Sequence, residues 1–291
     1  MTGWLKDVLS LLVALSLAAA SEPSQEPPEE PTGETPAPSV EPYAQAMKEG
    51  DLAFAGRDDA ERLTVAVARY EEALRLRPGD ESALIALCRA EAFAARATPG
   101  EALPAWQRTA RFAEQALRIS APTFASSVDR GEDPVLASAR VDARAAEPLY
   151  WFALATLGLG QARGMAATLA VKDVARGLME RAAALDERVD HGGPCRALGA
   201  LLATLPSAAG GGAQAAGREF SRATALFPSY ELTRVIEAQT LAVLLQDRAR
   251  FEALLHEVLS FDETRAPEVA PENRLAKRLA KELLAREDRL F

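Results

Sequence analysis

A four-residue pattern limits what this chain can fold into. Ala216, Phe220, Ala223 and Pro228 follow one another at the spacing seen in the second helix of a tetratricopeptide repeat (TPR) hairpin. Each residue type has a physical reason. The alanines let two helices approach closely and the aromatic ring fills the gap between hairpins. The proline ends the helix because it cannot continue the hydrogen-bond ladder.

The pattern recurs, and recurrence is what a repeat fold requires. A full copy lies at Ala66, Tyr70, Ala73 and Pro78. A weaker copy lies at Ala175, Met179 and Ala182, with Glu187 in the position of the proline. The first-helix half of the signature lies at Trp151, Leu154 and Ala155. Because one helical hairpin cannot bury its own apolar face, repeated hairpins must stack. The sequence therefore predicts an all-α fold, a TPR-like α-solenoid.

Breaks between the apolar-periodic segments predict about five helix pairs plus a C-terminal capping helix. The predicted helices are 43–55 with 60–76, 81–97 with 103–119, 148–159 with 165–185, 195–205 with 216–228, 230–245 with 248–259, and 273–289. Between them, residues 121–147 predict a long loop with one short helix. Asn273 is expected to cap the last helix, whose mixed charged and apolar residues suit the end of an array.

Composition agrees with helices and excludes one class of partner. Apolar residues make up 48% of the chain but aromatic residues only 6%, so alanine supplies much of the core, as closely packed helices allow. The net charge is −9. Nucleic-acid binding needs a basic face, so we expect no nucleic-acid partner.

The N-terminus resembles an export signal. Lys6 precedes an apolar run over residues 8–17, and Ala18 to Ala20 supply small residues for cleavage. The run is shorter than the roughly 20 residues of a transmembrane helix. We therefore expect a signal peptide over residues 1–20 and a periplasmic protein, with an uncleaved membrane anchor as the alternative.

Residues 21–42 differ from the rest of the chain in composition. They contain seven prolines and six acidic residues. Such a segment cannot bury enough apolar surface to offset the entropy of ordering, so it predicts a disordered linker. It is either a tether that reaches from a membrane or a tail without a specific role. The repeat domain then covers residues 43–291.

Short segments of the C-terminal half carry a family resemblance. In chain order they are Leu149-Tyr150-Trp151, Met179-Glu180-Arg181-Ala182, Leu185-Asp186-Glu187, Leu198-Gly199, Leu205-Pro206, Gly211-Gly212, Gln246-Asp247-Arg248, Phe251, and the tail from Asn273 through Leu283-Leu284 to Leu290-Phe291. From Pro148 onward the chain resembles the T-component family of TRAP transporters, the tripartite ATP-independent periplasmic transporters.

The resemblance implies a periplasmic TPR-like protein that assembles with the transporter's solute-binding protein. It also implies association with itself around a central passage and handling of a small, apolar ligand. Family members are frequently lipoproteins, but no cysteine follows the apolar run here. The form of membrane attachment therefore stays open.

Exposed positions on the first helix of each TPR hairpin line the concave groove, where a partner or ligand would bind. The predicted groove residues are Ser82, Ile85, Arg89, Phe93, Phe152, Thr156, Val235 and Gln239. Ile85, Phe93 and Phe152 beside Arg89 would suit an organic anion with a hydrophobic body. The alternative is that these side chains simply pack against neighbouring helices.

Three other features favour a structural role. The repeat position of Trp151 predicts core packing rather than a ligand platform. Gly192-Gly193 and Gly210-Gly211-Gly212 are typical of helix ends with positive φ, with backbone anion nests as the alternative.

Cys88 and Cys195 lie four helices apart, and packed helices are separated by about 8–10 Å, so the distance between the two cysteines exceeds the roughly 7 Å reach of a disulfide. They predict two free, buried thiols.

Enzyme signatures are incomplete in this sequence. His256-Glu257 begins like a zinc-protease helix, but Ser260 stands where the second histidine is required. Gly158 and Gly160 lack the third glycine of a dinucleotide-binding turn, because Arg163 takes its place. We therefore expect no catalysis, no metal and no cofactor.

The sequence thus predicts a periplasmic accessory subunit of a TRAP-type uptake system. It would bind a solute-binding protein and a small apolar or organic-anion ligand. The alternative is a general TPR scaffold for cell-envelope assembly, whose groove captures a peptide or helix.

Overall fold

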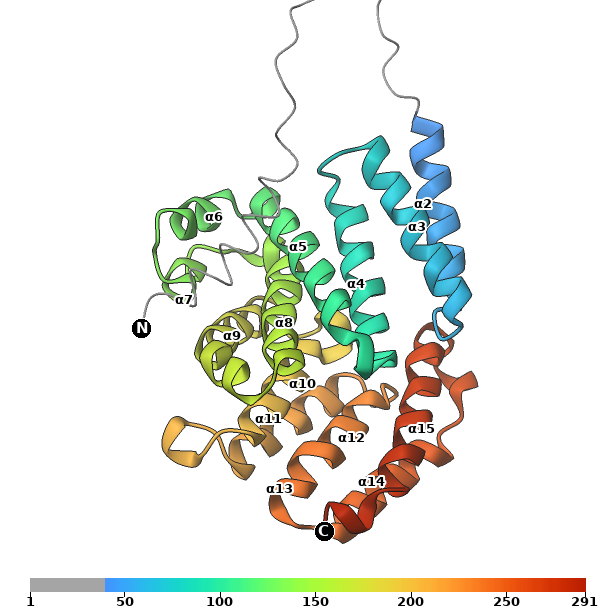
Figure 1. Cartoon of the computed structure of the whole chain (residues 1–291), viewed down its shortest axis with the longest axis vertical. Coiled ribbons are helices and arrows are strands. Elements are labelled where there is room, and N and C mark those ends of the chain that lie inside the picture. Colours follow the sequence, from blue (N-terminus) through green and yellow to red (C-terminus); the bar gives the residue numbers. More distant parts are fainter. Residues whose placement is uncertain (1–39) are drawn as a thin grey trace, which may run out of the picture.

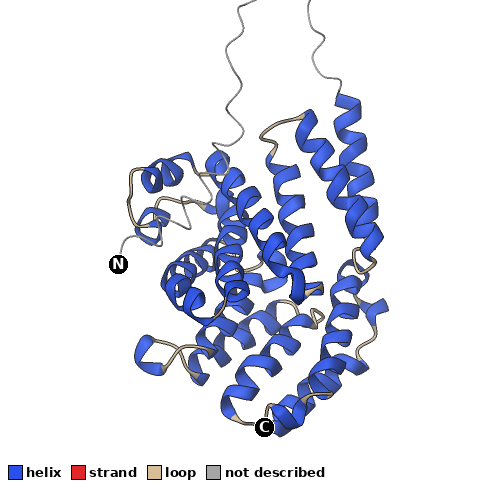
Figure 2. Ribbon diagram, in the orientation of Figure 1, coloured by secondary structure: helices blue, strands red, loops and turns tan. Residues whose placement is uncertain are grey.

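The computed structural model describes residues 40–291, and the predicted signal peptide and nearly all of the predicted linker lie outside them. Within this range the chain forms helices, turns and loops but no strand, so the all-α prediction is confirmed there (Figure 2). No helix in residues 40–291 combines the length and hydrophobicity that crossing a bilayer requires.

Consecutive long helices pack against one another in hairpins (Figure 1). The long helices are α2 (Val40–Phe54), α3 (Ala60–Leu76), α4 (Glu81–Ala97), α5 (Ala102–Ser120), α8 (Ala146–Arg163), α9 (Met165–Leu185), α10 (Val189–Ala203), α11 (Ala213–Leu226), α14 (Arg248–Ser260) and α15 (Ala270–Leu284). The closest packing joins α2 to α3, α4 to α5, α8 to α9 and α10 to α11, and α5 also packs along α8.

Aspartate side chains cap the N-termini of several of these helices. The Asp59 side chain accepts hydrogen bonds from the backbone N–H groups of Glu61 and Arg62 at 2.9 and 3.0 Å. Asp80 accepts from the N–H of Ala83 at 2.9 Å and from the Tyr43 hydroxyl at 2.7 Å. These bonds satisfy N–H groups that have no partner inside the helix, so the predicted starts at residues 60 and 81 are confirmed.

The predicted loop over residues 121–147 contains more helix than we expected. It holds two short helices, α6 (Pro122–Asp129) and α7 (Pro134–Ser138). Each begins at a proline, because proline at the first helical position lacks only an N–H that would be unsatisfied anyway. The expectation of one short helix is therefore wrong.

Asn273 does not cap the last helix. That helix, α15, begins three residues earlier, and Asn273 is fully buried inside it. Its amide accepts from the N–H of Glu231 at 3.0 Å and donates to the carbonyl of Ser229 at 2.9 Å. The Asn273 side chain thus hydrogen-bonds to backbone groups of the loop before α12 (Leu232–Glu237), about forty residues earlier in the sequence.

The fifth predicted helix pair has an irregular first member. This first member begins with α12, continues through a π-helical stretch at Ala238–Ala242 and ends with α13 (Val243–Leu245). Asp247 then accepts from the N–H of Arg250 at 3.0 Å and starts α14. The predicted break between the two members is therefore confirmed.

Two main apolar cores hold the helices together. The first extends from α3 to α11 and includes Tyr70, Trp106, Trp151 and Phe220. The second joins α12, α14 and α15 around Phe251, and Phe93 of α4 packs into it. Because α4 contributes to both cores, the N-terminal and C-terminal helices form one packed body.

The last helix also packs against the first hairpin. Arg57, in the turn between α2 and α3, forms an ion pair with Glu272 of α15, and its Nη2 donates to the carbonyl of Glu268 at 3.2 Å. Next to it, Arg274 donates twice to Asp58, at 2.6 and 2.7 Å. Figure 1 shows α15 directly beside the α2–α3 turn.

Glycine allows a very close approach of two helices in the first core. A Cβ on Gly158 of α8 would lie 2.5 Å from the indole of Trp106 on α5. We predict that Gly158→Ala lowers the free energy of unfolding by about 1–3 kcal/mol, because the ring has to move in a packed core. Urea denaturation followed by circular dichroism measures this change.

Gly217 of α11 provides the matched control. A Cβ there would meet its nearest neighbour, Leu241, at an ordinary 3.7 Å. Gly217→Ala should therefore raise stability by about 0.5–1 kcal/mol, as alanine does inside a helix. Equal effects of the two substitutions would contradict the close α5–α8 approach.

Candidate functional site

A buried polar cluster forms where α10 begins. Asp190, His191 and Gly192 have φ values of 46°, 54° and 77°, so three successive residues adopt the left-handed conformation. Outside glycine this conformation costs roughly 1–2 kcal/mol per residue. Arg196, one turn further along, donates to the carbonyls of Asp190 and His191, each at 2.9 Å, and holds the turn in place.

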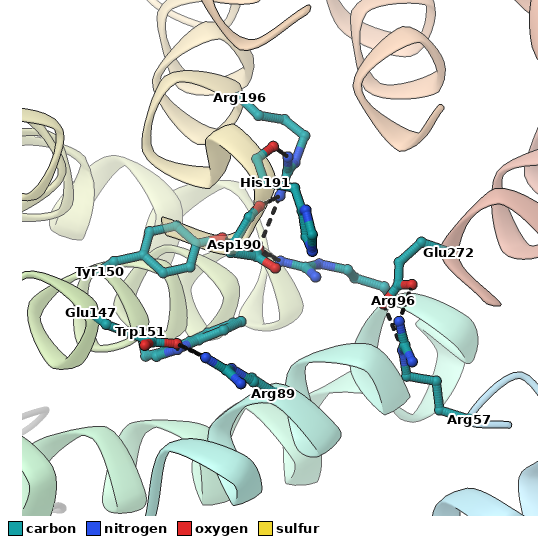
Figure 3. A network of polar contacts seen from close by, with 10 residues as sticks. All are labelled: Arg57, Arg89, Arg96, Glu147, Tyr150, Trp151, Asp190, His191, Arg196 and Glu272. Atoms are coloured by element: carbon teal, nitrogen blue, oxygen red, sulfur yellow. Dashed lines mark hydrogen bonds and ion pairs between the residues drawn. The ribbon is translucent and has the colours of Figure 1, made fainter. Parts of the chain in front are cut away.

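Asp190 binds groups from three helices (Figure 3). Its carboxylate accepts from Nη2 of Arg96 at 3.1 Å and from Nη2 of Arg196 at 2.9 Å. It also accepts from the hydroxyl of Tyr150 on α8. A Cβ on Gly193 would lie 2.5 Å from that hydroxyl oxygen, so the glycine lets Tyr150 reach the turn.

Aromatic rings complete the cluster. The His191 ring stacks on Tyr230 with centroids 5.1 Å apart and meets the Phe227 ring edge-on at 5.2 Å. The Arg196 guanidinium lies 4.4 Å from the centroid of the Tyr230 ring. We call Arg96, Tyr150, Asp190, His191, Arg196 and Tyr230 the Asp190 cluster.

The cluster carries more positive than negative charge. Burial raises the pKa of the Asp190 carboxyl, but attraction to Arg96 and Arg196 and the Tyr150 hydrogen bond outweigh it, so the net pKa is lowered. Burial lowers the pKa of His191, which is therefore neutral at pH 7. Two guanidinium groups thus face one carboxylate.

A second buried ion pair lies beside the cluster and adds no net charge. Nε of Arg57 donates to Glu272 at 2.7 Å, and its guanidinium lies over the rings of Phe54 and Phe93, 4.5 and 5.8 Å from their centroids. Glu272 interacts electrostatically with both His191 and Tyr230, so the two groups are neighbours. Figure 3 shows Arg57 and Glu272 on the far side of Arg96 from Asp190.

The structure distributes the eight predicted groove residues between surface and core. Ser82, Arg89 and Gln239 are exposed and Thr156 is half-buried. The apolar members are buried: Ile85 and Phe152 in the first core, Phe93 and Val235 in the second. A partner that approaches this chain therefore meets the polar members. Their binding role stays a prediction.

Arg89 takes part in a small polar contact of its own. Its Nη2 lies 2.8 Å from Oε1 of Glu147, which also accepts from the indole N–H of Trp151 at 3.2 Å (Figure 3). The indole itself is 1% exposed, so the predicted core role of Trp151 is confirmed. Arg89 is thus fixed at the surface above a buried tryptophan.

Sequence reasoning missed most of the Asp190 cluster. Only the turn was singled out, and the positive φ predicted for its glycines is confirmed at Gly192. One signal was available: Arg196 interrupts an otherwise apolar run over residues 195–205, and a buried charge requires a partner. No local pattern points from there to Arg96, one hundred residues upstream.

The two cysteines and His256 were the other residues considered for chemistry, and none of them takes part in a functional cluster of the described residues. Both cysteines are free and buried, as predicted. Cys88 donates to the carbonyl of Thr109 at 3.7 Å, which suits its small-residue position between α4 and α5. His256 is exposed. Within residues 40–291 no three His, Cys, Asp or Glu side chains are grouped so that they could hold a metal ion.

Comparison with known protein families relates most of this chain to one of them. The sequence model of a family described as TRAP transporter T-component matches residues 86–291, more than two thirds of the chain. The matched range contains the Asp190 cluster and six of the eight predicted groove residues. No curated protein matches the chain.

We predict that Asp190→Asn lowers the free energy of unfolding by about 3–5 kcal/mol. The substitution keeps the side-chain shape, and asparagine tolerates the left-handed backbone, but two buried guanidinium groups lose their counter-charge. Chemical denaturation of the two proteins measures the difference.

Asp173→Asn is the matched control. Asp173 pairs with Lys172 at 2.7 Å, but its side chain is 81% exposed. Exposed ion pairs contribute at most about 1 kcal/mol, so the control should be close to wild type. A loss at Asp190 no larger than at Asp173 would show that the cluster does not hold the fold.

Proposed function

Because the chain belongs to the TRAP transporter T-component family, we propose that it is a non-enzymatic, periplasmic accessory subunit of a TRAP-type uptake system. It binds the system's solute-binding protein and a small apolar or organic-anion ligand. The single observation that carries this proposal is the family match across residues 86–291.

The proposal includes three parts of the chain. Residues 1–20 direct export and are removed, and a linker follows up to the start of α2. The predicted boundary between linker and domain at residues 42 and 43 is three residues too late, because α2 begins at Val40. The composition of the first two segments supports this division. Self-association around a central passage is a further part of the proposal and rests on the family resemblance.

We also propose that the paired helices are TPR-like repeats. The pairs are α2 with α3, α4 with α5, α8 with α9, α10 with α11, and the α12–α13 segment with α14. Burial of the signature residues supports this assignment: Ala66, Ala73, Ala216, Phe220 and Ala223 are 0% exposed and Tyr70 is 1% exposed. In this arrangement α15 caps the last pair.

The surface proposed for the solute-binding protein is polar. It contains Ser82, Arg89 and Gln239 on the first helices of their pairs, where TPR proteins bind partners. A groove that captures a peptide or helix for envelope assembly is the competing function. Co-purification from periplasmic extract separates the two. A solute-binding protein encoded beside this chain supports our proposal, whereas an outer-membrane assembly factor in its place contradicts it.

We predict that Arg89→Ala weakens binding of the solute-binding protein about tenfold or more, as loss of an interface arginine does. Helicity should be unchanged, because Arg89 is exposed and its ion pair with Glu147 contributes little to folding. Surface plasmon resonance with the solute-binding protein encoded beside this chain measures the affinity, and circular dichroism measures the helicity.

Arg222→Ala is the matched control. Arg222 is similarly exposed and also forms ion pairs, with Glu187 and Glu219, but it lies on α11, the second helix of its pair. Its substitution should leave binding unchanged. Equal affinity of the Arg89 variant and wild type would remove Arg89 from the interface.

A further inference from the structure

Buried polar atoms without partners are concentrated at one place in the fold. Four buried side-chain N or O atoms make no hydrogen bond to another described residue, and three of them belong to Tyr230, Glu231 and Thr233. Tyr230, a member of the Asp190 cluster, and Glu231 directly precede α12, and Thr233 lies in its first turn. Folded proteins satisfy nearly all such atoms, so this concentration requires an explanation.

The Tyr230 hydroxyl is the atom that faces the cluster. Tyr230 is 1% exposed, and its ring contacts Arg196 and His191. Burial raises the pKa of its phenol, and the charges of Asp190, Arg196, Glu272 and Arg96 lie close enough to influence this pKa. The hydroxyl nevertheless donates to none of the neighbouring carboxylates. It is a buried donor that points among charged groups and is not used by the fold.

Arg96 has unused donors at the same place. Its Nη2 is directed to Asp190 and Tyr150, whereas Nε and Nη1 donate to no other residue of the described chain. Its side chain is 18% exposed, compared with 4% for Arg196. Arg96 and the half-buried His191 therefore form the side of the cluster that solvent reaches.

We propose that the Asp190 cluster binds the carboxylate of a small monoanionic organic acid, with Arg96 and the Tyr230 hydroxyl as donors. Within the proposed function, which this inference presupposes for its biological role, the cluster is the ligand site of the accessory subunit. The acid enters from the side of Arg96 and His191.

Charge and geometry select this ligand class. Two guanidinium groups face one carboxylate, so a single negative charge neutralises the cluster. Arginine and phenol donors match the oxygens of a carboxylate. The rings of His191, Phe227 and Tyr230, which pack on one another, give the cluster an apolar border that suits an acid with an aromatic or short apolar body. Because the Tyr230 hydroxyl is buried, a free acid reaches it more readily than a carboxylate on another protein's surface.

The test uses benzoate as the probe and the full mature chain. Isothermal titration calorimetry should detect benzoate binding, and benzamide, which has the same shape without the charge, should bind at least about tenfold more weakly. Absence of benzoate binding up to 20 mM, a concentration of the order that weak-ligand titrations reach, would overturn the proposal. Equal binding of benzamide would overturn it as well.

Two tyrosine variants then locate the site. Tyr230→Phe removes the unpartnered hydroxyl, so it should weaken benzoate binding about tenfold while the melting temperature stays equal or rises. Tyr70→Phe removes an equally buried hydroxyl that donates to Asp51 at 2.9 Å. It should lower the melting temperature and leave benzoate binding unchanged. Unaltered benzoate affinity in the Tyr230 variant would refute the assigned site.

These outcomes are independent of the partner assay. If the chain does not bind benzoate but binds the solute-binding protein, the proposed carboxylate site is wrong and the proposed accessory role stands. Benzoate binding through Tyr230 in a chain that captures no solute-binding protein supports the site and removes the accessory role.

Discussion

The pairing of Asp190 with two arginines is the contact on which the arrangement of the central helices depends. Arg96 comes from the end of α4, Tyr150 from α8, and Asp190 and Arg196 from the start of α10. Removing one partner of such a buried group leaves an uncompensated charge, which is far costlier than replacing the whole group by apolar residues. The cluster therefore connects α4, α8 and α10 through one carboxylate, and loss of that carboxylate would leave buried positive charge without a counter-charge.

A second set of ion pairs joins the ends of the described chain. Arg57 with Glu272, and Asp58 with Arg274, connect the α2–α3 turn to α15 across more than two hundred residues. Open repeat arrays leave their first and last units apart, and each unit contacts only its neighbours. Here Phe93 of α4 also enters the C-terminal core. The terminal helices thus stabilise each other, and the Asp190 cluster lies next to the contact they make.

The sequence was informative where the physics is local. Apolar periodicity and the breaks between apolar segments predicted α3, α4 and α9 to the residue, since each depends on neighbours within a few turns. Asn273 shows where such reasoning fails. Its amide could cap a helix or satisfy a distant loop, and only the three-dimensional packing brings Ser229 and Glu231 within reach. Arg96 pairs with a residue about one hundred positions away, which no spacing rule connects.

Three costs to stability coincide at the start of α10 and α12. Two non-glycine residues hold left-handed conformations, a buried carboxylate faces two guanidinium groups, and a buried phenol makes no hydrogen bond to the rest of the described chain. Each alone has structural explanations, but strain and unsatisfied donors cluster where proteins bind ligands. Well-packed apolar residues in place of such a buried ionic group are often neutral or stabilising. Retention of charge and an unused donor in one spot is the arrangement expected when folding leaves interactions for a ligand to complete.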